Sequence, residues 1–287
     1  MAAQVCVVGS VNMDQVFTVA SLPRPGETVM ASSVRLVPGG KGGNQAIAAA
    51  RAGAAVQLIA ALGDDAAAEH LRTHLQSNGV GLDGLIGVDG PSGSAVIAVE
   101  AAGENTIIVA PGANALLTVE SGRTRAVIAG SDVLLLQLEI PVATAVDAAR
   151  VARDSGTVVI VNASPSGAAA PHDLLQLARL ADVVVVNEAE ARDWHWPVPH
   201  LVITRGGRGA SYLGEDERFD VPALAVRAVD TAGAGDVFAG VLAAEWSAGH
   251  ENAMRRACAA GALATTIRGA GDCAPFAGEI DAAVATG

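Results

Sequence analysis

The stretch 230–236, of sequence Asp-Thr-Ala-Gly-Ala-Gly-Asp, places small residues directly before a carboxylate that opens an apolar helix. Gly233, Ala234 and Gly235 let backbone N–H groups converge on one point, where the helix N-terminus adds roughly half a positive charge. Such an anion hole suits phosphoryl oxygens. Asp236 is placed to accept a hydroxyl proton as a phosphate arrives. A glycine-rich loop whose aspartate only caps the helix has the same local sequence.

A second glycine-rich stretch, 39–44, reads Gly-Gly-Lys-Gly-Gly-Asn and leads into an alanine-rich helix. Glycines permit a ligand to approach the backbone closely, and the Asn44 amide offers two donors and an acceptor. The stretch is not a Walker A loop, because glycine rather than Ser or Thr follows Lys41. An ordinary junction between a loop and a helix has the same composition, so both interpretations stay open.

Polar residues follow two of the apolar runs. Asn12 and Asp14 come after a run that ends at Gly9, and they could hold sugar hydroxyls, because ligands of open parallel sheets bind outside the carboxyl ends of the strands. Asn187 and Glu190 follow another run, and they could orient the water molecules that Mg²⁺ usually keeps. Turn formation and helix capping explain both pairs equally well.

The stretch 204–209, Thr-Arg-Gly-Gly-Arg-Gly, follows a further apolar run. It combines two guanidinium groups with a flexible backbone, which is what binding of a nucleotide phosphate requires. Arginines that simply lie in a surface loop are the common alternative.

Composition excludes several classes of protein. The 287 residues are 51% hydrophobic and 17% charged, which rules out intrinsic disorder. The net charge of −12 argues against a partner that is a nucleic acid or an anionic membrane, since lysine and arginine supply that affinity. The three cysteines show no zinc spacing and no disulfide framework. With no signal-peptide pattern and no apolar run of bilayer length, we expect a cytoplasmic protein.

Strand-like runs that are apolar on both faces alternate with helical runs. We expect strands at 5–9, 56–61, 133–138, 158–162, 183–187 and 201–204, and helices at 44–52, 65–78, 144–154, 236–248 and 251–267. This alternation predicts an α/β fold, a three-layer α/β/α sandwich with a mostly parallel sheet, in a single domain over 1–287.

Two stretches interrupt the alternation, because they have no helical period and read as extended strands. They predict a small β-sheet lid, formed by about 15–38 and 92–111 and inserted in the domain. In the second stretch, 95–100 and 106–110 flank a turn at 101–104, as in a hairpin. A small sheet with an apolar face must cover something, which here is the site or a second copy of the chain.

The ordered set of motifs is more specific than any one of them. Asn-x-Asp, Gly-Gly-Lys-Gly-x-Asn, Asn-x-x-Glu and Asp-Thr-x-Gly-Ala-Gly-Asp follow one another, and together they resemble the ribokinase family of carbohydrate and nucleoside kinases over nearly the whole chain. The resemblance implies ATP-dependent phosphorylation of D-ribose at its 5-hydroxyl, with Mg²⁺ and K⁺ as cofactors. It also implies a lid that closes over the sugar and joins two subunits in a homodimer.

The resemblance assigns roles to individual residues. Asp236 would be the catalytic base beside the anion hole. The sugar would be contacted by Asp236 and by Asn12, Asp14, Gly40, Lys41, Gly42, Gly43, Asn44 and Glu139. ATP would be contacted by Asn187, Thr204, Arg205, Gly206, Gly207, Arg208, Gly209, Gly235 and Cys258. Mg²⁺ would be held through water by Asn187 and Glu190. K⁺ would be held by Asp230, Ala232, Ala264, Ile267, Gly269 and Cys273.

The chain departs from the family pattern at three places. It is short between Glu190 and Thr204, Cys258 stands where a histidine is frequent, and Cys273 replaces a common serine. Other interpretations remain: the same transfer to adenosine, fructose or a deoxy sugar acid, or a sensor of sugar or nucleotide without catalysis. A nicotinamide oxidoreductase is disfavoured, because the first strand lacks the glycine fingerprint and its acidic partner.

Overall fold

The main sheet has eight strands. The computed structural model describes residues 2–100, 104–167 and 170–286. The strands lie in the order β14 (Arg218–Val221), β13 (Ala210–Leu213), β12 (His200–Thr204), β11 (Val183–Asn187), β10 (Val158–Asn162), β9 (Val133–Leu136), β1 (Gln4–Val8) and β4 (Ala55–Ile59). The strands from β12 to β4 pair in parallel, and β13 and β14 add antiparallel at one edge. The predicted mostly parallel sheet is confirmed.

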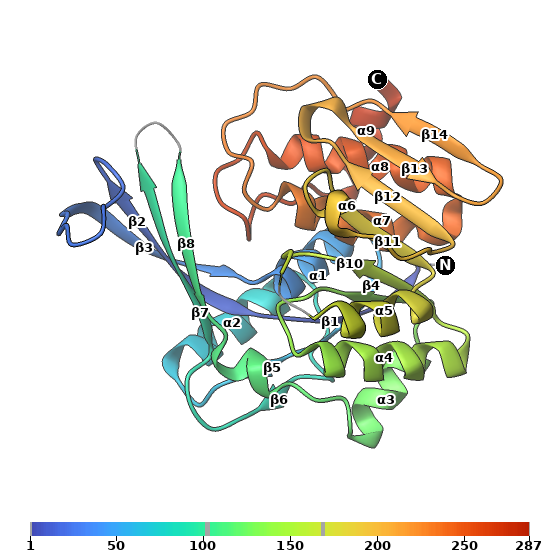
Figure 1. Cartoon of the computed structure of the whole chain (residues 1–287), viewed down its shortest axis with the longest axis horizontal. Helices are drawn as coiled ribbons and strands as arrows, with labels where there is room; N and C mark the ends of the chain where they lie inside the picture. Colours follow the sequence, from blue (N-terminus) through green and yellow to red (C-terminus); the bar gives the residue numbers. More distant parts are fainter. Residues whose placement is uncertain (1, 101–103, 168–169, 287) are drawn as a thin grey trace.

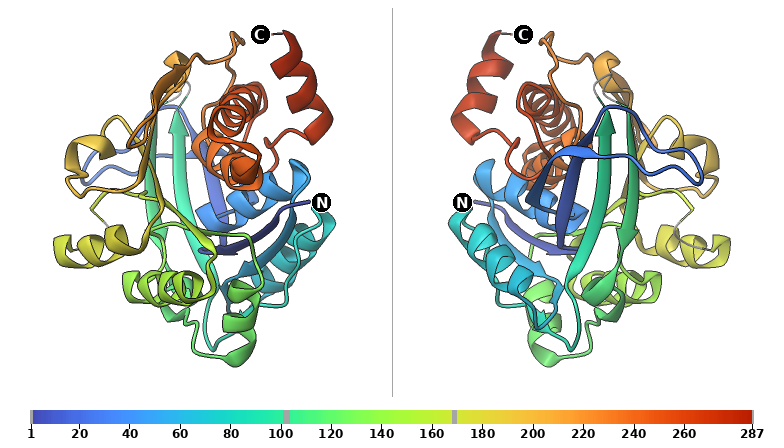
Figure 2. Two further views of the ribbon diagram at one scale, coloured as in Figure 1. Left: turned by 90° about the vertical axis from the view of Figure 1, so that its right-hand side faces the viewer. Right: turned by 90° about the vertical axis from the view of Figure 1, so that its left-hand side faces the viewer.

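Helices cover both faces of this sheet, which explains why its strands are apolar on both sides (Figures 1 and 2). In β1, Val5 and Val7 pack into one core, while Cys6 and Val8 pack into the other. The first core contains α1 (Lys41–Arg51), α2 (Ala66–Ser77), α7 (Ala234–Glu245), α8 (His250–Ala264) and α9 (Ala277–Thr286). The second contains α3 (Gly122–Ala129), α4 (Val142–Ser155) and α5 (Pro171–Leu180).

Element boundaries differ from the sequence prediction by a few residues. The strand expected at 56–61 ends at Ile59, and Ala61–Leu62 form a separate short strand, β5, that pairs with β6 (Ile86–Gly87). The helix expected at 236–248 begins two residues earlier and ends at Glu245, where the 3-10 turn η3 (Trp246–Ala248) follows. Two further 3-10 turns are η1 (Gly112–Leu116) and η2 (Gly206–Arg208).

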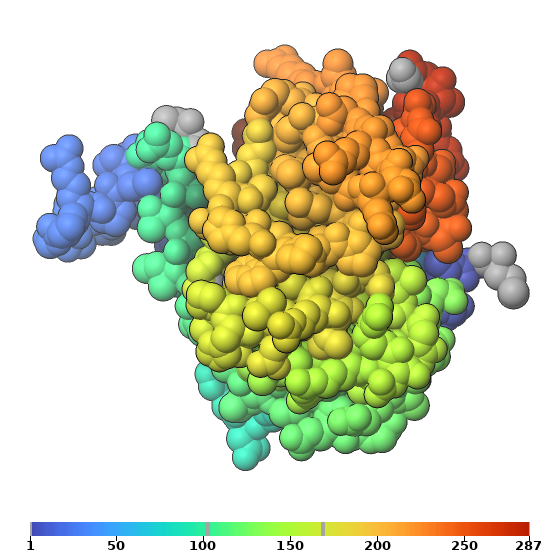
Figure 3. Space-filling view, turned by 45° about the vertical axis from the view of Figure 1, so that its right-hand side comes forward, coloured from blue at the N-terminus to red at the C-terminus, as the bar shows by residue number. Residues whose placement is uncertain are grey.

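A second sheet projects from the main body, as Figures 1 and 3 show. Its order is β3 (Ala31–Gly39), β2 (Asn12–Val19), β7 (Gly93–Glu100) and β8 (Asn105–Ala110), so both stretches predicted to be extended form it. Strands β2 and β3 reach beyond the 15–38 boundaries, and of the predicted turn at 101–104, residues 101–103 lie outside the described residues.

The two faces of the small sheet carry different side chains. Register places Asp14 between Val37 and Ala95, and Ala95 beside Val109, so these four side chains share one face. The opposite face aligns Leu36 with Gln15, Val96 and Ile108 across the four strands. That outer face exposes four large apolar side chains: Val34, Leu36, Val96 and Ile108.

The helices of the described segments are each too short or too polar to cross a lipid bilayer.

Candidate active site

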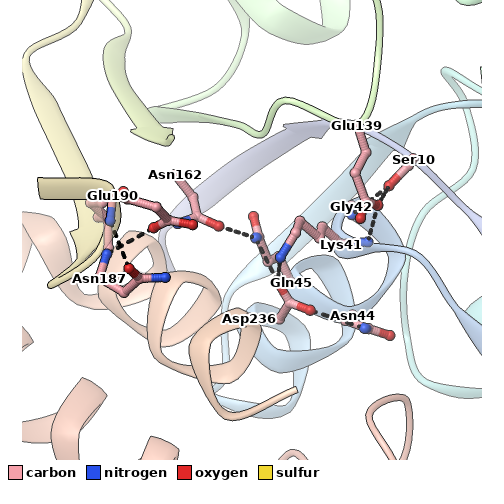
Figure 4. A network of polar contacts seen from close by, with 11 residues as sticks. Ser10, Lys41, Gly42, Asn44, Gln45, Glu139, Asn162, Asn187, Glu190 and Asp236 are labelled. Atoms are coloured by element: carbon pink, nitrogen blue, oxygen red, sulfur yellow. Dashed lines mark hydrogen bonds and ion pairs between the residues drawn. The ribbon is translucent and has the colours of Figure 1, made fainter. Parts of the chain in front are cut away.

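Polar side chains gather at the carboxyl ends of the parallel strands. Ser10 follows β1, Glu139 follows β9, and Asn162, Asn187 and Thr204 are the last residues of β10, β11 and β12. Because these strands run in parallel, their ends meet at one edge of the sheet. The N-termini of α1 and α7 reach the same edge and add Lys41, Asn44 and Asp236 (Figure 4).

Asp236 lies in the first turn of α7 and is 7% exposed. Its Oδ2 accepts a hydrogen bond from Asn44 Nδ2 at 3.1 Å, and its Oδ1 accepts one from Gln45 Nε2 at 3.0 Å. The ammonium of Lys41 lies 4.0 Å from Oδ1. One face of α1 therefore fixes a buried carboxylate on the neighbouring helix through three polar residues, Lys41, Asn44 and Gln45.

Lys41 lies among three carboxylates. Burial works against its charged form, but Asp236, Glu139 and Glu190 outweigh burial and raise the pKa of Lys41 above its ordinary value. Glu139 Oε2 also accepts hydrogen bonds from Ser10 Oγ at 2.6 Å and from the backbone N–H of Lys41 at 3.1 Å. A charged lysine is therefore held between the carboxylates of Glu139 and Asp236.

Asp14 is half-buried, and its Oδ1 is a buried atom that no hydrogen-bond donor of the described residues reaches. Burial, and then the nearby charge of Glu139, raise the pKa of Asp14 to about 7, although a backbone N–H at Ala95 acts in the opposite direction. A buried acceptor without a donor is expected at a site that receives a ligand.

Several glycines of the stretch 39–44 are required by close packing within the chain. Gly40 has a φ of +87°, and a Cβ built on it would lie 2.8 Å from the backbone nitrogen of Asn12. A Cβ on Gly42 would lie 2.6 Å from the carbonyl carbon of Gly9. These glycines bring the N-terminus of α1 against the end of β1, which places Lys41 and Asn44 at the site.

The N-terminus of α7 offers free donors, as the anion-hole interpretation requires. Gly233 is its N-cap, with a φ of 77°, and no side chain of the described residues caps it. The N–H of Ala234 is donated to the carbonyl of Thr231 at 3.3 Å. Gly235, the next residue, is exposed, so its backbone N–H is the predicted donor best placed to meet a ligand.

Asn187 and Glu190 form a reciprocal cap on α6 (Glu190–Asp193). Asn187 Oδ1 accepts from the backbone N–H groups of Ala189 and Glu190, each at 2.9 Å, and Glu190 Oε2 accepts from the backbone N–H of Asn187 at 2.8 Å. The capping alternative is therefore present. Glu190 is also buried and raises the pKa of Lys41, so its charge faces the site as well.

The arginines of the stretch 204–209 are both paired with carboxylates. Arg205 Nη2 lies 2.6 Å from Asp220 Oδ1, and Arg208 pairs with Glu188. Cys258 lies near this loop, because its thiol contacts the carbonyl of Val221 at 3.9 Å and that same carbonyl packs against Gly209. Burial raises the pKa of Cys258 to about 12. Gly206, Gly207 and Gly209 complete the loop, whose position at the end of β12 matches the prediction.

The residues assigned to a monovalent cation come from two loops that meet beside α7. Asp230 accepts from the backbone N–H of Ala232 and from that of Gly269, both at 3.0 Å. The thiol of Cys273 contacts the carbonyl of Ala232 at 3.8 Å. Burial first, and then the charges of Asp236 and Asp230, raise the pKa of Cys273 to about 11. Ala264 is buried at the end of α8, and Ile267 is exposed beyond it.

Four polar residues of the site were not singled out from the sequence: Ser10, Gln45, Asn114 and Asn162. Asn114 holds Asn12 in place, since its Nδ2 donates to Asn12 Oδ1 at 2.8 Å. Gln45 Nε2 donates to Asn162 Oδ1 at 3.1 Å as well as to Asp236. The position of Asn162 at the carboxyl end of a predicted parallel strand was a signal that could have found it.

The site combines the parts that phosphoryl transfer to a hydroxyl group requires. It has an immobilised carboxylate that can accept a proton, a charged lysine beside it and a helix N-terminus with free N–H groups. Among the described residues, no group of three or more His, Cys, Asp or Glu side chains forms a cluster for a metal ion. Mg²⁺ usually keeps several of its waters in proteins, so binding of that ion does not require a cluster of this kind.

Comparison with known proteins places these motifs in a family context. The pfkB family carbohydrate kinase model matches residues 2–196 and 195–277. The chain is 33% identical, over 95% of its length, to the bifunctional ribokinase/ribose-5-phosphate isomerase A of Fructilactobacillus sanfranciscensis, of which it spans 54%. It is 32% identical to the ribokinase of Bacillus subtilis, with 96% of this chain and 98% of the relative covered.

A solved ribokinase structure and a deoxyribokinase sequence are also similar to this chain. The Arabidopsis thaliana ribokinase complexed with ribose and ATP superposes with a TM-score of 0.90 over 99% of both chains, at 27% identity. The deoxyribokinase of Salmonella typhi is 31% identical, over 92% of this chain and 93% of its own length. The similarity therefore covers kinases of at least two pentose substrates.

Proposed function

This chain belongs to the pfkB family of carbohydrate kinases, and from that premise we propose that it phosphorylates D-ribose at the 5-hydroxyl with ATP, giving D-ribose 5-phosphate and ADP. The observation that carries the proposal is the Asp236 carboxylate, which is 7% exposed and held by the amides of Asn44 and Gln45 at the uncapped N-terminus of α7. A non-catalytic sensor has no need of such a group.

Asp236 accepts the proton of the 5-hydroxyl of ribose while the hydroxyl oxygen attacks the γ-phosphorus of ATP in line. The N–H groups at the start of α7 and the charged Lys41 oppose the negative charge of the phosphoryl oxygens. The transition state is loose, so positioning and charge neutralisation supply most of the catalysis. Arg205 and Arg208 reach the nucleotide by exchanging their carboxylate partners for phosphate oxygens.

Two cations belong to the proposal. Glu190 and Asn187 would hold Mg²⁺ through water, and the ion would neutralise charge at the phosphates; the buried Glu190 carboxylate is the group that suits this role. Asp230, whose two carboxylate oxygens each accept one backbone N–H, would hold K⁺ together with main-chain carbonyls such as those of Ala232 and Ala270, since a hard cation prefers oxygen ligands; the ion would add a positive charge near the anion hole.

The charges of the site support a neutral polyol as the acceptor. Asp236, Glu139 and Glu190 act on a single lysine, Lys41, and Asp14 lies near Glu139. The hydroxyls of a sugar donate hydrogen bonds to carboxylates, whereas a sugar acid would add a further carboxylate to these four, which like-charge repulsion disfavours. Ribose and 2-deoxyribose remain the two pentoses that relatives of this chain point to.

The test is ADP production from ATP with a panel of ribose, 2-deoxyribose, fructose, adenosine and a deoxy sugar acid, with Mg²⁺ and K⁺ present. The proposal expects the highest kcat/KM with D-ribose and a product whose phosphate is on the 5-oxygen, identified by NMR. A higher kcat/KM with 2-deoxyribose or a nucleoside would show that ribose is not the preferred substrate. Sugar binding without ADP release would show that the chain is a sensor and not a kinase.

The small sheet acts as a lid in this proposal, and it joins two subunits. The face with Asp14 and Ala95 covers the sugar and excludes water from the phosphate. The outer face exposes Val34 and Leu36 on β3, Val96 on β7 and Ile108 on β8, and Gln15 of β2 lies between Leu36 and Val96. Large apolar side chains exposed on one face of a sheet mark an interaction surface, and a second copy of the sheet is its occupant.

A further inference from the structure

A path of hydrogen bonds through the side chain of Gln45 links Asp236 to the main sheet. The Nε2 atom of Gln45 lies 3.0 Å from Asp236 Oδ1 and 3.1 Å from Asn162 Oδ1 (Figure 4). Asn162 in turn donates from Nδ2 to the backbone carbonyl of Val185 at 3.3 Å. A continuous path of hydrogen bonds therefore runs from β11 through β10 and α1 to the carboxylate on α7.

The direction of each bond in this path is determined by its ends. The carbonyl of Val185 only accepts, so Asn162 presents its amino group to it and its oxygen to Gln45. The carboxylate of Asp236 also only accepts when it is ionised. Gln45 must therefore use both of its N–H donors, one for each neighbour, and the reversed amide would place its oxygen against two other oxygens.

The side chain of Gln45 is buried and makes its hydrogen bonds only within the site. It is 0% exposed, and its remaining atom, Oε1, is buried with no partner among the described residues. A polar group in this situation costs folding free energy, so stability alone gives no reason for a glutamine at this position. A glutamine amide is therefore expected here only if the protein needs its two N–H donors.

We propose that Gln45 is a positioning residue for the phosphoryl transfer: its amide holds Asp236 Oδ1 in place, so that the carboxylate keeps the orientation in which it accepts the hydroxyl proton. The inference rests on the proposed function, in which Asp236 is the base. Asn44 restrains the other oxygen, and a planar carboxylate held at both oxygens has one orientation.

Two substitutions test the role of the amide. Gln45→Met keeps the length and helix preference of the side chain and removes both donors, while Gln45→Glu keeps the shape and places a second carboxylate beside Asp236. Loss of a hydrogen bond to a charged group predicts a fall in kcat of about ten- to hundredfold for Gln45→Met. KM for ribose should stay within about threefold, because Asp14, Lys41 and Glu139 are unchanged.

Gln45→Glu should also move the acid limb of the kcat–pH profile to higher pH, because the two adjacent carboxylates resist ionising together. A residue with only a structural role would lower the melting temperature of Gln45→Met without lowering its kcat at the optimum pH. Gln57→Met is the matched control: Gln57 is half-buried on β4 and accepts from the backbone N–H of Asp83, and its variant should keep the wild-type kcat and pH profile.

A double-mutant cycle separates this inference from the proposed function. In the Asp236→Asn background, Gln45→Met should lower the residual kcat by less than about twofold, because the carboxylate that it positions is gone. If Gln45→Met and Gln45→Glu fold and keep the wild-type kcat while Asp236→Asn is inactive, the role of Gln45 is overturned and the base remains. If Asp236→Asn itself keeps the wild-type kcat, the proposed function fails first. Should Gln45→Met not fold, the pH profile of the nearly isosteric Gln45→Glu decides alone, and an unmoved acid limb overturns the role.

Discussion

A Cβ atom built on Gly240 in α7 would lie 2.4 Å from the main-chain oxygen of Gln45 in α1. The two helices therefore approach more closely at this level than any side chain on residue 240 would allow. This contact lies one turn after Asp236, and it brings the amides of Asn44 and Gln45 within hydrogen-bond distance of that carboxylate. Because Gly240 has no Cβ, α1 and α7 can pack closely enough to form the site.

The first prediction concerns this contact. Gly240→Ala should lower the free energy of unfolding by about 1–3 kcal/mol, because the backbone of α1 must move to admit the methyl group. It should also lower kcat, since α1 carries the residues that hold Asp236. Gly278→Ala in α9 is the control, because no atom of the described residues outside its own stretch of helix lies within 4 Å of its built Cβ, and it should leave stability unchanged or raise it slightly. Urea unfolding and an ADP assay measure both effects, and equal stability of the two variants would contradict the contact.

The second prediction concerns the base. Asp236→Asn should reduce kcat by roughly 10²–10⁴, the range for loss of a general base, because the amide no longer accepts the hydroxyl proton. Ribose should still bind, as measured by calorimetry, because its other contacts remain. Asp216→Asn, in an exposed loop, is the control and should have wild-type kcat. A kcat for Asp236→Asn within a factor of three of wild type would remove the residue from the mechanism.

The third prediction concerns pH and Asp14. Its pKa is raised to about 7 in the folded chain, whereas the unfolded chain ionises this group near pH 4. Between these values the folded state binds the extra proton, so this group makes stability fall as pH rises, by about 1.4 kcal/mol per pH unit at most. Asp14→Asn should therefore be more stable than wild type at pH 8, while it loses affinity for ribose.

The stabilising effect of Asp14→Asn should vanish near pH 4, where the folded and unfolded wild-type chains are both protonated at this position. Urea unfolding at pH 4.5 and pH 8 measures the difference, with the exposed Asp89→Asn as the matched control. An effect of Asp14→Asn that is the same at both pH values would show that the carboxyl group is not the cause.

The fourth prediction concerns the monovalent cation. Activity should rise when K⁺ is added and should rise little with Na⁺ at the same ionic strength. Asp230→Asn should weaken the response to K⁺, because it removes the charge from the group that joins the loops of Ala232 and Gly269. The measurement is a titration of kcat with KCl against NaCl. Equal activation by both salts would count against these two loops as the cation site.

The fifth prediction concerns the outer face of the small sheet. Leu36→Lys and Ile108→Lys should convert a dimer to a monomer in sedimentation velocity, because each places a charge in the apolar contact. Leu116→Lys changes an equally exposed apolar residue in η1, on the main body, and should leave the dimer intact. A wild-type chain that sediments as a monomer at all concentrations would refute the proposed interface.

Much of the architecture follows from the sequence. The periods of the apolar residues predicted the mostly parallel sheet, and the strands at 158–162 and 183–187 match β10 and β11 residue for residue. The small sheet was predicted from two stretches without a helical period. The sequence did not predict five further elements: the antiparallel strands β13 and β14 and the helices α3, α5 and α9. Short or weakly patterned segments take their structure from the surface that they pack against.

The sequence by itself determined which chemical groups are present and at which strand or helix end each one lies. The glycine-rich turn before Asp236 and the lysine in the first turn of α1 are local features, set by backbone chemistry over a few residues. Only the tertiary structure decided which groups meet. Gln45 and Asp236 are 191 positions apart, and their hydrogen bond depends on how closely two helices pack, which no local period encodes.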